Sequence, residues 1–196
     1  MAKRTAKVER QTAETQIQVA LNLDGTGRYE IATGVGFFDH MLTHLAKHGK
    51  FDLKVQASGD LEVDQHHTVE DVGLALGQAL LQAVGDKAGL ARFGEASAPL
   101  DEALVTAVID FGGRPHLEYN LELPAAKVGE FDTELTREFF LAVANAAGLN
   151  LHLRQKAGLN THHIIEAAFK AFARALDQAT SLDPRVSGVP STKGSL

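Results

Sequence analysis

The chain carries one short motif twice, and this repeat restricts the folds that it can adopt. His66-His-Thr-Val-Glu70 recurs as His162-His-Ile-Ile-Glu166, and each copy opens a segment whose apolar residues have helical spacing. Self-similarity in a constant order indicates a duplicated structural unit. Two further pairs of similar segments occur in the same order along the chain: 23–28 with 109–114, and Phe37-Phe38 with Phe139-Phe140.

The periodicity of apolar residues predicts similar elements in both halves. Alternation predicts strands at 16–23 and 53–57, and the glycine-rich 24–27 predicts a hairpin turn into a strand around Tyr29 and Ile31. Helical spacing predicts helices over 39–48 and 69–84. The second half gives strands at 103–110, 116–123 and 149–153, and helices at 133–147 and 162–179. Each half therefore has the predicted order strand, strand, helix, strand, helix.

We expect an α+β fold, internally duplicated, in which each half is a mixed sheet covered by helices. The predicted boundaries are 1–90 for the first half and 91–182 for the second. Residues 183–196 have the composition of a loop, with two prolines and two glycines, and are predicted to form a flexible C-terminal tail.

Composition excludes several classes of site. The 196 residues include no cysteine, which excludes disulfides, thiolate zinc sites and iron–sulfur clusters. A formal net charge of −6 does not indicate a nucleic-acid-binding surface. The start of the chain lacks the apolar core of a secretory signal, and no apolar run is long enough to cross a bilayer. We expect a cytoplasmic protein without a nucleic-acid or membrane partner.

The spacing inside the repeated motif indicates metal binding. On a helix, the first His and the Glu lie about 40° apart around the axis, whereas the second His is rotated by about 100° from the first. Adjacent imidazoles therefore address different ions, and two motif copies predict a pair of ions. Imidazole and carboxylate ligands without sulfur favour manganese, iron, cobalt, nickel or zinc. A single copy is more often a capping or surface group, and the duplication is what favours a metal site.

Further ligands are expected upstream of each motif copy. His40 precedes His66 by 26 residues, and Glu138 precedes His162 by 24 residues, each on the helix before its motif. These two residues are predicted to be equivalent fourth ligands, although Glu138 alone also fits a solvated helix charge. His44 and His48 follow His40 at intervals of four residues and could line the site or belong to the core or surface. His116 and His152 are expected to be structural. Asp101-Glu102 could form a cap and are given no functional role.

Several motifs, in the correct order, resemble the imidazoleglycerol-phosphate dehydratase family from about Thr12 to the C-terminus. These motifs are the segments 36–42, 64–73, 99–104, 113–115, 160–171 and 190–194. The resemblance implies a duplicated fold of the ribosomal protein S5 domain 2-like type and two manganese ions per active site. It also implies a homo-oligomer of 24 subunits built from trimers, with metal ligands contributed across subunit boundaries.

The resemblance also implies roles for individual residues. The implied metal ligands are His40, His66, His67, Glu70, His162, His163 and Glu166. The family often has histidine where this chain has Glu138, which we still expect to ligate because carboxylates bind manganese. The implied contacts to the substrate phosphate are Arg92, Arg114, Lys170, Ser191, Thr192 and Lys193, so that the tail closes on the phosphate. Glu14 matches the family's substrate-contacting glutamate and is the predicted catalytic acid or base, with an exposed strand-end charge as the alternative.

The resemblance predicts a lyase of histidine biosynthesis that converts D-erythro-imidazole glycerol phosphate into imidazole-acetol phosphate and water. No carbonyl adjoins the carbon that loses its proton, so we hypothesise that two manganese ions stabilise the ring as an imidazolate, which expels the neighbouring hydroxyl. The same ligands would suit a dinuclear metal phosphoesterase, or a non-catalytic metal-binding protein, and these are the two alternatives.

Overall fold

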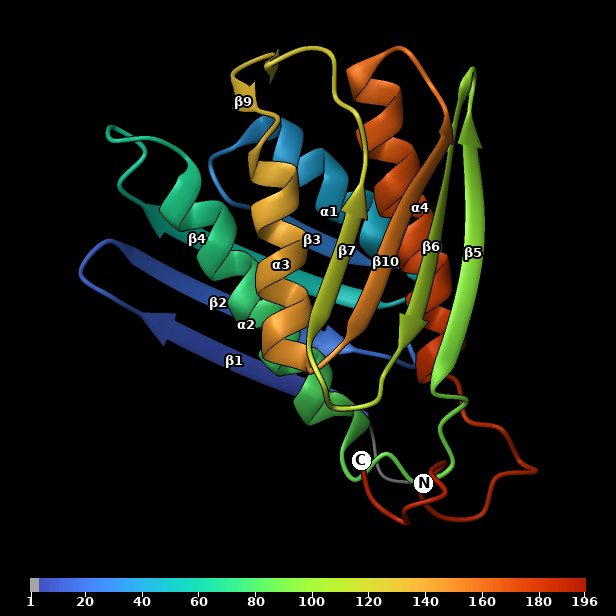
Figure 1. Cartoon of the computed structure of the whole chain (residues 1–196). Helices are drawn as coiled ribbons and strands as arrows, with labels where there is room; N and C mark the ends of the chain where they lie inside the picture. The colour runs from blue at the N-terminus through green and yellow to red at the C-terminus, as the bar shows by residue number, and fades with distance from the viewer. Residues whose placement is uncertain (1–3) are drawn as a thin grey trace.

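The duplication predicted from the sequence is visible in the order of the elements (Figure 1). The computed structural model describes residues 4–196. The first half contains β1 (Thr5–Gln11), β2 (Thr15–Asn22), β3 (Tyr29–Ala32), α1 (Gly36–Gly49), β4 (Asp52–Gly59) and α2 (His66–Val84). The second half contains β5 (Phe93–Leu100), β6 (Ala103–Asp110), β7 (His116–Asn120), α3 (Leu135–Ala147), β10 (Asn150–Ala157) and α4 (Thr161–Thr180), with the short pair β8 (Lys127–Val128) and β9 (Phe131–Asp132) before α3.

The two main sheets have the same strand order. The first sheet has the order β1-β2-β4-β3, and the second has the order β5-β6-β10-β7. In each sheet the last strand of the order runs parallel to its neighbour and the other pairs are antiparallel. Both sheets are therefore mixed, and the α+β duplicated fold expected from the sequence is confirmed.

Two details of the sequence-based prediction were wrong. The first strand of each half was missed, because β1 and β5 bury only small or isolated apolar residues, such as Val8 in β1 and Ala96 in β5. The glycine-rich turn after β2 also does not form a hairpin with β3. Instead β3 pairs in parallel with β4, with Ile31 opposite Val55, and β2 pairs with β1 and β4. Turn residues fix where a chain reverses but not which strand it then joins.

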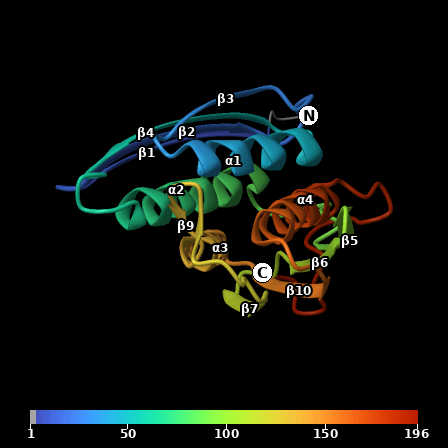
Figure 2. The same ribbon diagram turned by 90° about the horizontal axis from the view of Figure 1, so that it is seen from above.

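The molecule has four layers, sheet, helices, helices, sheet (Figure 2). Helices α1 and α2 cover the inner face of the first sheet, and α3 and α4 cover the inner face of the second. In the middle, α2 packs on α3 and α1 packs on α4. The helices of each half therefore bury their apolar faces against both their own sheet and the helices of the other half.

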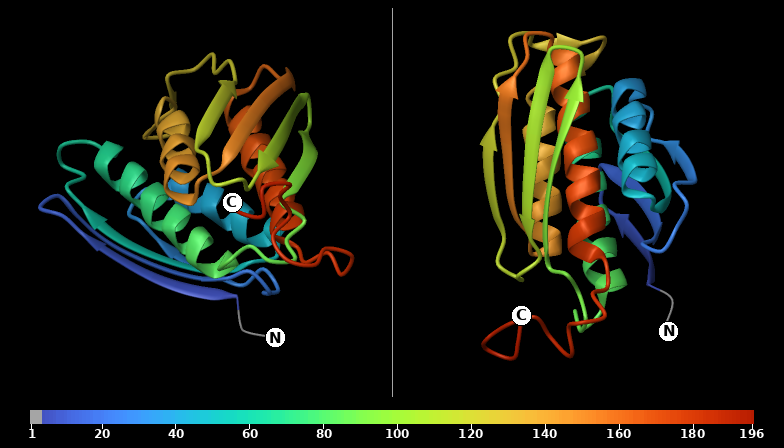
Figure 3. Two further views of the ribbon diagram at one scale, coloured as in Figure 1. Left: turned by 60° about the horizontal axis from the view of Figure 1, so that its bottom comes forward. Right: turned by 90° about the vertical axis from the view of Figure 1, so that its right-hand side faces the viewer.

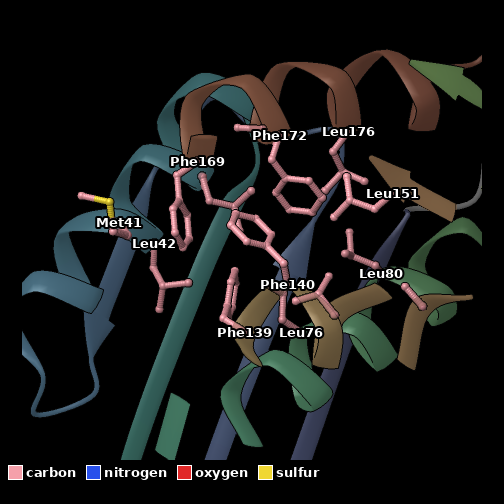
Figure 4. Packing of buried hydrophobic residues seen from close by; sticks show 14 of the residues in the cluster. Met41, Leu42, Leu76, Leu80, Phe139, Phe140, Leu151, Phe169, Phe172 and Leu176 are labelled. Carbon is pink, nitrogen blue, oxygen red and sulfur yellow. The ribbon is translucent and has the colours of Figure 1, made fainter. Parts of the chain in front are cut away.

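Aromatic side chains fill the space between the helical layers (Figure 4). The rings of Phe139 and Phe140 in α3 lie 5.2 and 4.9 Å, respectively, from the ring of Phe169 in α4, measured between centroids. Leu76 of α2 and Leu42 of α1 are fully buried in the same cluster. The ring of Phe38 in α1, from the first half, lies 5.2 Å from the ring of Phe139, from the second half, so this core fixes how the halves are placed against each other.

The C-terminal segment lies beside the residues that lead into β5 and is hydrogen-bonded to them (Figure 3). The amide of Asp183 donates to the carbonyl of Gly89, and the amide of Gly89 donates to the carbonyl of Gly188. The Arg92 guanidinium donates to the carbonyl of Pro190 at 2.8 Å. These contacts bring the end of the chain beside the start of β5. None of the helices within residues 4–196 combines the length and the apolar composition that a membrane span requires.

Candidate metal and phosphate sites

One cluster of metal-ligating side chains joins the two halves of the fold. His40 comes from α1, and His162 and Glu166 come from α4. One ligand atom of each residue lies within 4.8 Å of those of the other two. Glu166 Oε2 is 3.2 Å from the Nε2 atoms of both His40 and His162. Spacing along the sequence predicts that His40 lies with His66 of its own half, but this is wrong: packing of α1 on α4 places His40 with the second motif.

The other oxygen of Glu166 is held by two further side chains. Glu166 Oε1 lies 2.6 Å from Lys170 Nζ, one helical turn later, and 3.2 Å from His44 Nε2. Burial raises the pKa of Glu166, but the Lys170 hydrogen bond and the neighbouring histidines outweigh it and lower this pKa to about 2. Burial, reinforced by neighbouring cationic side chains, lowers the pKa of His44 to about 4. At neutral pH the cluster therefore combines a carboxylate with neutral imidazole at His44, which is the protonation state that metal binding requires.

The helices that carry the motifs begin in the same way. The Asp64 carboxylate accepts from the amide of His66 at 2.7 Å, and the Asn160 side chain accepts from the amide of His162 at 2.9 Å. Each acceptor stands two residues before the first His of its motif and satisfies an amide that the helix leaves free. The histidines are thus fixed at the first turn of α2 and α4.

Within each motif, the two histidines point in different directions. The ring planes of His66 and His67 make an angle of 78° with centroids 6.2 Å apart, and those of His162 and His163 make an angle of 79° with centroids 6.1 Å apart. The two histidines of the second motif also have different partners: His162 Nε2 is 3.2 Å from Glu166 Oε2, whereas His163 Nδ1 is 2.8 Å from Glu102 Oε2. Each motif offers its two imidazoles to different surroundings.

A second cluster surrounds the other face of the first motif. Glu14 in the β1–β2 turn, Asp60 after β4 and His67 in α2 have ligand atoms within 4.8 Å of one another. Asp60 Oδ2 is 3.0 Å from His67 Nδ1, whereas Glu14 Oε2 is 3.6 Å from the same nitrogen. The Asp60 hydrogen bond, helped by the charge of Glu14, raises the pKa of His67. The Glu14 side chain is 54% exposed, so its carboxylate is open to a ligand.

Three of the remaining predicted metal ligands, His66, Glu70 and Glu138, lie on α2 and α3. His66 Nε2 is 3.9 Å from Glu70 Oε2, and Glu138 accepts from its neighbour Arg137 at 3.0 Å. Among residues 4–196, Glu138 belongs to neither cluster of three ligand atoms. Gly73 contacts Phe139 and Gly77, four residues later, contacts Val143, so α2 and α3 run in the same direction. Glu70 and Glu138 therefore stand at the same end of this helix pair.

Five of the six predicted phosphate contacts line one pocket, at the C-terminal segment. Its volume is about 400 Å³. Arg92 is oriented there by Asp110, whose oxygens accept from Nε at 2.6 Å and from Nη2 at 3.0 Å. Lys170 does not line this pocket and instead pairs with Glu166. The pocket is lined by Arg92, Gly112, Gly113, Arg114, Ser191, Thr192, Lys193, Ser195 and Leu196.

Sequence reasoning gave no role to two carboxylates that the structure places on the motif histidines. Glu102 Oε2 lies 2.8 Å from His163 Nδ1, and Asp60 occupies the same position relative to His67. Glu102 precedes His163 by 61 residues and no local spacing links them. The one available signal was the Asp101-Glu102 pair in the turn before an apolar strand, which is also an ordinary turn composition.

Comparison with known sequences gives a single consistent result. The sequence model of the family described as imidazoleglycerol-phosphate dehydratase matches residues 33–176. A curated relative with this name from Desulforamulus reducens is 60% identical over 196 residues, covering all of both chains. Another from Jannaschia sp. is 59% identical over 194 residues, covering 98% of this chain and 100% of that protein.

Solved structures of the same description have similar folds. The crystal structure of imidazoleglycerol-phosphate dehydratase from Staphylococcus aureus superimposes with a TM-score of 0.83 at 42% identity, covering 91% of this chain and 99% of that one. The Pyrococcus furiosus protein gives a TM-score of 0.84 at 36% identity, covering 96% of this chain and 100% of that one. The similarity in sequence and in fold therefore extends over nearly the whole chain.

Proposed function

The chain belongs to the imidazoleglycerol-phosphate dehydratase family and is a hydro-lyase of histidine biosynthesis, and from this premise we propose that its active site is a two-manganese centre on the repeated histidine motifs. The main support for this centre is that His40 of α1 lies close to His162 and Glu166 of α4. These residues would hold one ion.

The donor set fits manganese. Imidazole nitrogens and carboxylate oxygens suit first-row divalent metals, and a carboxylate with a lowered pKa is already ionised at neutral pH. The second ion would be held by residues on α2 and α3, namely His66, Glu70 and Glu138. His67 and His163, whose Nδ1 atoms lie beside Asp60 and Glu102, would complete the two centres. Manganese, when bound, supplies positive charge next to the substrate ring as negative charge develops there.

Residues of the chain would bind the phosphate end of the substrate and position it. Arg92 is held in place by Asp110 and can offer fixed donors to phosphate oxygens, and Arg114 and Lys193 add positive charge in the same pocket. Ser191 and Thr192 add hydroxyl donors to this pocket. Lys170 would act on the metal side, because its ammonium holds Glu166 and can reach an anionic group bound beside it.

Loss of water requires a proton to leave one carbon and hydroxide to leave its neighbour, so an acid or base must reach the substrate. We propose Glu14 for this role. Its carboxylate is more than half exposed and lies beside His67, a predicted metal ligand. A Glu14→Gln variant should retain its manganese and lose most of its turnover, whereas full turnover would remove Glu14 from the catalytic machinery.

The active form would be an oligomer, which we propose to contain 24 subunits built from trimers. The described protomer brings together three ligands for one ion, and manganese prefers six. His67 and His163 stand at the protomer surface, 35% and 28% exposed, and could ligate an ion held mainly by a neighbouring copy. Mass measurement in solution, with and without manganese, tests the assembly directly.

The central experiment combines metal analysis with the reaction. Purified protein should contain about two manganese ions per chain and should form imidazole-acetol phosphate from imidazole glycerol phosphate. Removal of metal with a chelator should abolish dehydration, and added manganese should restore it. Dehydration that persists after complete removal of metal would contradict the two-manganese centre.

The two alternatives considered from the sequence are not supported. A dinuclear phosphoesterase and a non-catalytic metal-binding protein would both share the ligands, but the relatives and solved structures similar to this chain carry the dehydratase name. Release of inorganic phosphate from generic phosphate esters would be the result that favours the phosphoesterase.

A further inference from the structure

A carboxylate stands behind the second histidine of each motif copy. Glu102 Oε2 is 2.8 Å from His163 Nδ1, and Asp60 Oδ2 is 3.0 Å from His67 Nδ1. An ionised carboxylate can only accept a hydrogen bond, so in each pair Nδ1 must carry the proton. In the neutral imidazole the lone pair is then on Nε2, on the opposite side of the ring from that carboxylate.

The two carboxylates come from different places in the duplicated fold. Glu102 stands immediately before β6, and Asp60 stands immediately after β4. The position before β2 that corresponds to Glu102 is occupied by Glu14, because β2 and β6 each have 8 residues and each pairs with the strand before it. Glu14 and Glu102 are therefore equivalent positions in the two halves.

These equivalent glutamates have different surroundings. Glu102 Oε1 accepts from the amides of Leu159 and Asn160 at 3.1 and 2.8 Å, so this carboxylate is anchored on both oxygens. Glu14 Oε2 is 3.6 Å from His67 Nδ1, beyond hydrogen-bond distance, and the side chain is 54% exposed. In the first half the hydrogen bond to the histidine is made by Asp60 instead.

We propose that Asp60 and Glu102 are positioning residues for metal binding, each fixing its histidine with the proton on Nδ1 and with Nε2 presented to an ion. This inference rests on the proposed metal role of His67 and His163. A carboxylate behind a ligating imidazole fixes the ring orientation and raises its basicity, and its removal typically lowers metal affinity by about 10- to 100-fold.

A division of tasks follows from the duplication. In the second half one glutamate, Glu102, holds the histidine from the turn before the second strand. In the first half Asp60 holds the histidine, and the equivalent glutamate, Glu14, is left free to contact the substrate. The same position thus serves metal positioning in one half and proton transfer in the other.

The experiment is a manganese titration of metal-free full-length protein, with unbound Mn²⁺ measured from its electron paramagnetic resonance signal. Asp60→Ala removes the acceptor and should weaken manganese binding by about 10- to 100-fold. Asp60→Asn keeps an oxygen acceptor without the charge and should have an intermediate affinity. Both variants should regain dehydration when manganese is raised to saturation. Asp60 is the cleaner site, because its side chain hydrogen-bonds to His67 alone among the described residues.

Two further variants make the test specific. Glu62→Ala changes an exposed carboxylate of the same loop and should leave manganese affinity unchanged. Glu14→Gln should also leave manganese affinity unchanged while lowering kcat, which is the opposite pattern to Asp60→Ala. Glu102→Ala should weaken manganese binding too, but it also releases the amides of Leu159 and Asn160, so the thermal unfolding of its metal-free form is needed beside the titration.

The outcomes separate the two proposals. If wild-type protein binds no manganese, the metal centre itself fails. If the wild type binds manganese and Asp60→Ala binds it equally well, the positioning role is overturned and the metal centre stands. Weaker manganese binding in Glu14→Gln but not in Asp60→Ala would assign the positioning role to Glu14 and would also overturn the inference.

Discussion

Gly77 in α2 lies so close to Val143 in α3 that a Cβ on Gly77 would stand 2.8 Å from the Val143 carbonyl oxygen. The same Cβ would meet Ala146 Cβ at 2.7 Å. The backbones of the two helices are therefore in direct contact, and this contact sets the distance between Glu70 and Glu138 at the start of the helices.

A Gly77→Val substitution should destabilise the protein by about 1–3 kcal/mol. The added side chain would collide with backbone atoms of α3, so the two helices would have to move apart. The midpoint of thermal unfolding of the metal-free protein measures this effect. Gly36→Ala is the matched control, since nothing lies within 4 Å of a Cβ at Gly36, and it should leave the midpoint nearly unchanged. An unchanged midpoint in Gly77→Val would show that α2 and α3 can separate without cost.

Replacing Glu138 should change the number of bound manganese ions rather than the fold. Glu138→Ala removes a proposed ligand on α3 and should lower the manganese content per chain, whereas Glu138→His, which offers an imidazole ligand in its place, should retain it. Elemental analysis after dialysis gives the content. Glu134→Ala, an exposed carboxylate just before the same helix, is the control. Equal manganese content in all three variants would remove Glu138 from the ligand set.

Loss of a pocket arginine should act on substrate binding. Arg114 lines the pocket at the C-terminal segment, and a charged hydrogen bond to phosphate contributes about 1.5–3 kcal/mol. Arg114→Ala should therefore raise KM by about tenfold or more without changing manganese content. Arg185→Ala, also in the C-terminal segment but paired with Asp183, should leave KM unchanged. Steady-state kinetics on both variants decides, and an unchanged KM in Arg114→Ala would place the phosphate elsewhere.

The turn after β2 should contribute to acid sensitivity. The hydrogen bond from Arg28, together with those from the amides of Thr26 and Arg28, lowers the pKa of Asp52 below its usual range. Because the folded pKa is lower than the unfolded value of about 4, this stabilisation is present above pH 4 and is lost as the pH falls further. Asp52→Asn should therefore be less stable than wild type near neutral pH.

The difference between wild type and Asp52→Asn should narrow between about pH 4 and pH 2. Thermal unfolding of metal-free protein across this range measures it. Lys54→Gln, two residues later on the same strand, changes an exposed ion pair with Glu30 and serves as the control for a surface charge. A constant difference between wild type and Asp52→Asn at every pH would show that the lowered pKa of Asp52 does not contribute to folding.

The prediction of elements succeeded where the pattern was strong. Helix α4 has a long regular spacing of apolar residues, from Ile164 to Leu176, and the structure confirms it. Strand β1 was missed because only Ala6 and Val8 face the core there, too few to produce a visible alternation. The pairing of β3 was predicted wrongly. Whether β3 lies beside β2 or beside β4 depends on the path of α1, which connects β3 to β4.

The site shows the same division between local and distant information. The residues of each histidine motif lie within about one turn of helix, so their spacing can be recognised in the sequence. His162 and Glu166 could therefore be predicted together as ligands of one site. Glu102 could not be assigned, because it meets His163 only after β5, β6 and α4 have packed together.

Residue types and short spacings along the chain are enough to establish that the fold is duplicated, that its chemistry uses imidazole and carboxylate without sulfur, and which family the chain resembles. Each of these conclusions rests on features of the linear sequence, which do not depend on how the chain folds. That His40 meets the second motif rather than the first follows only from the packing of helices, because α1 buries its apolar face against α4. Folding also determines which carboxylates stand behind His67 and His163, since loops from separate strands converge there only in the folded chain.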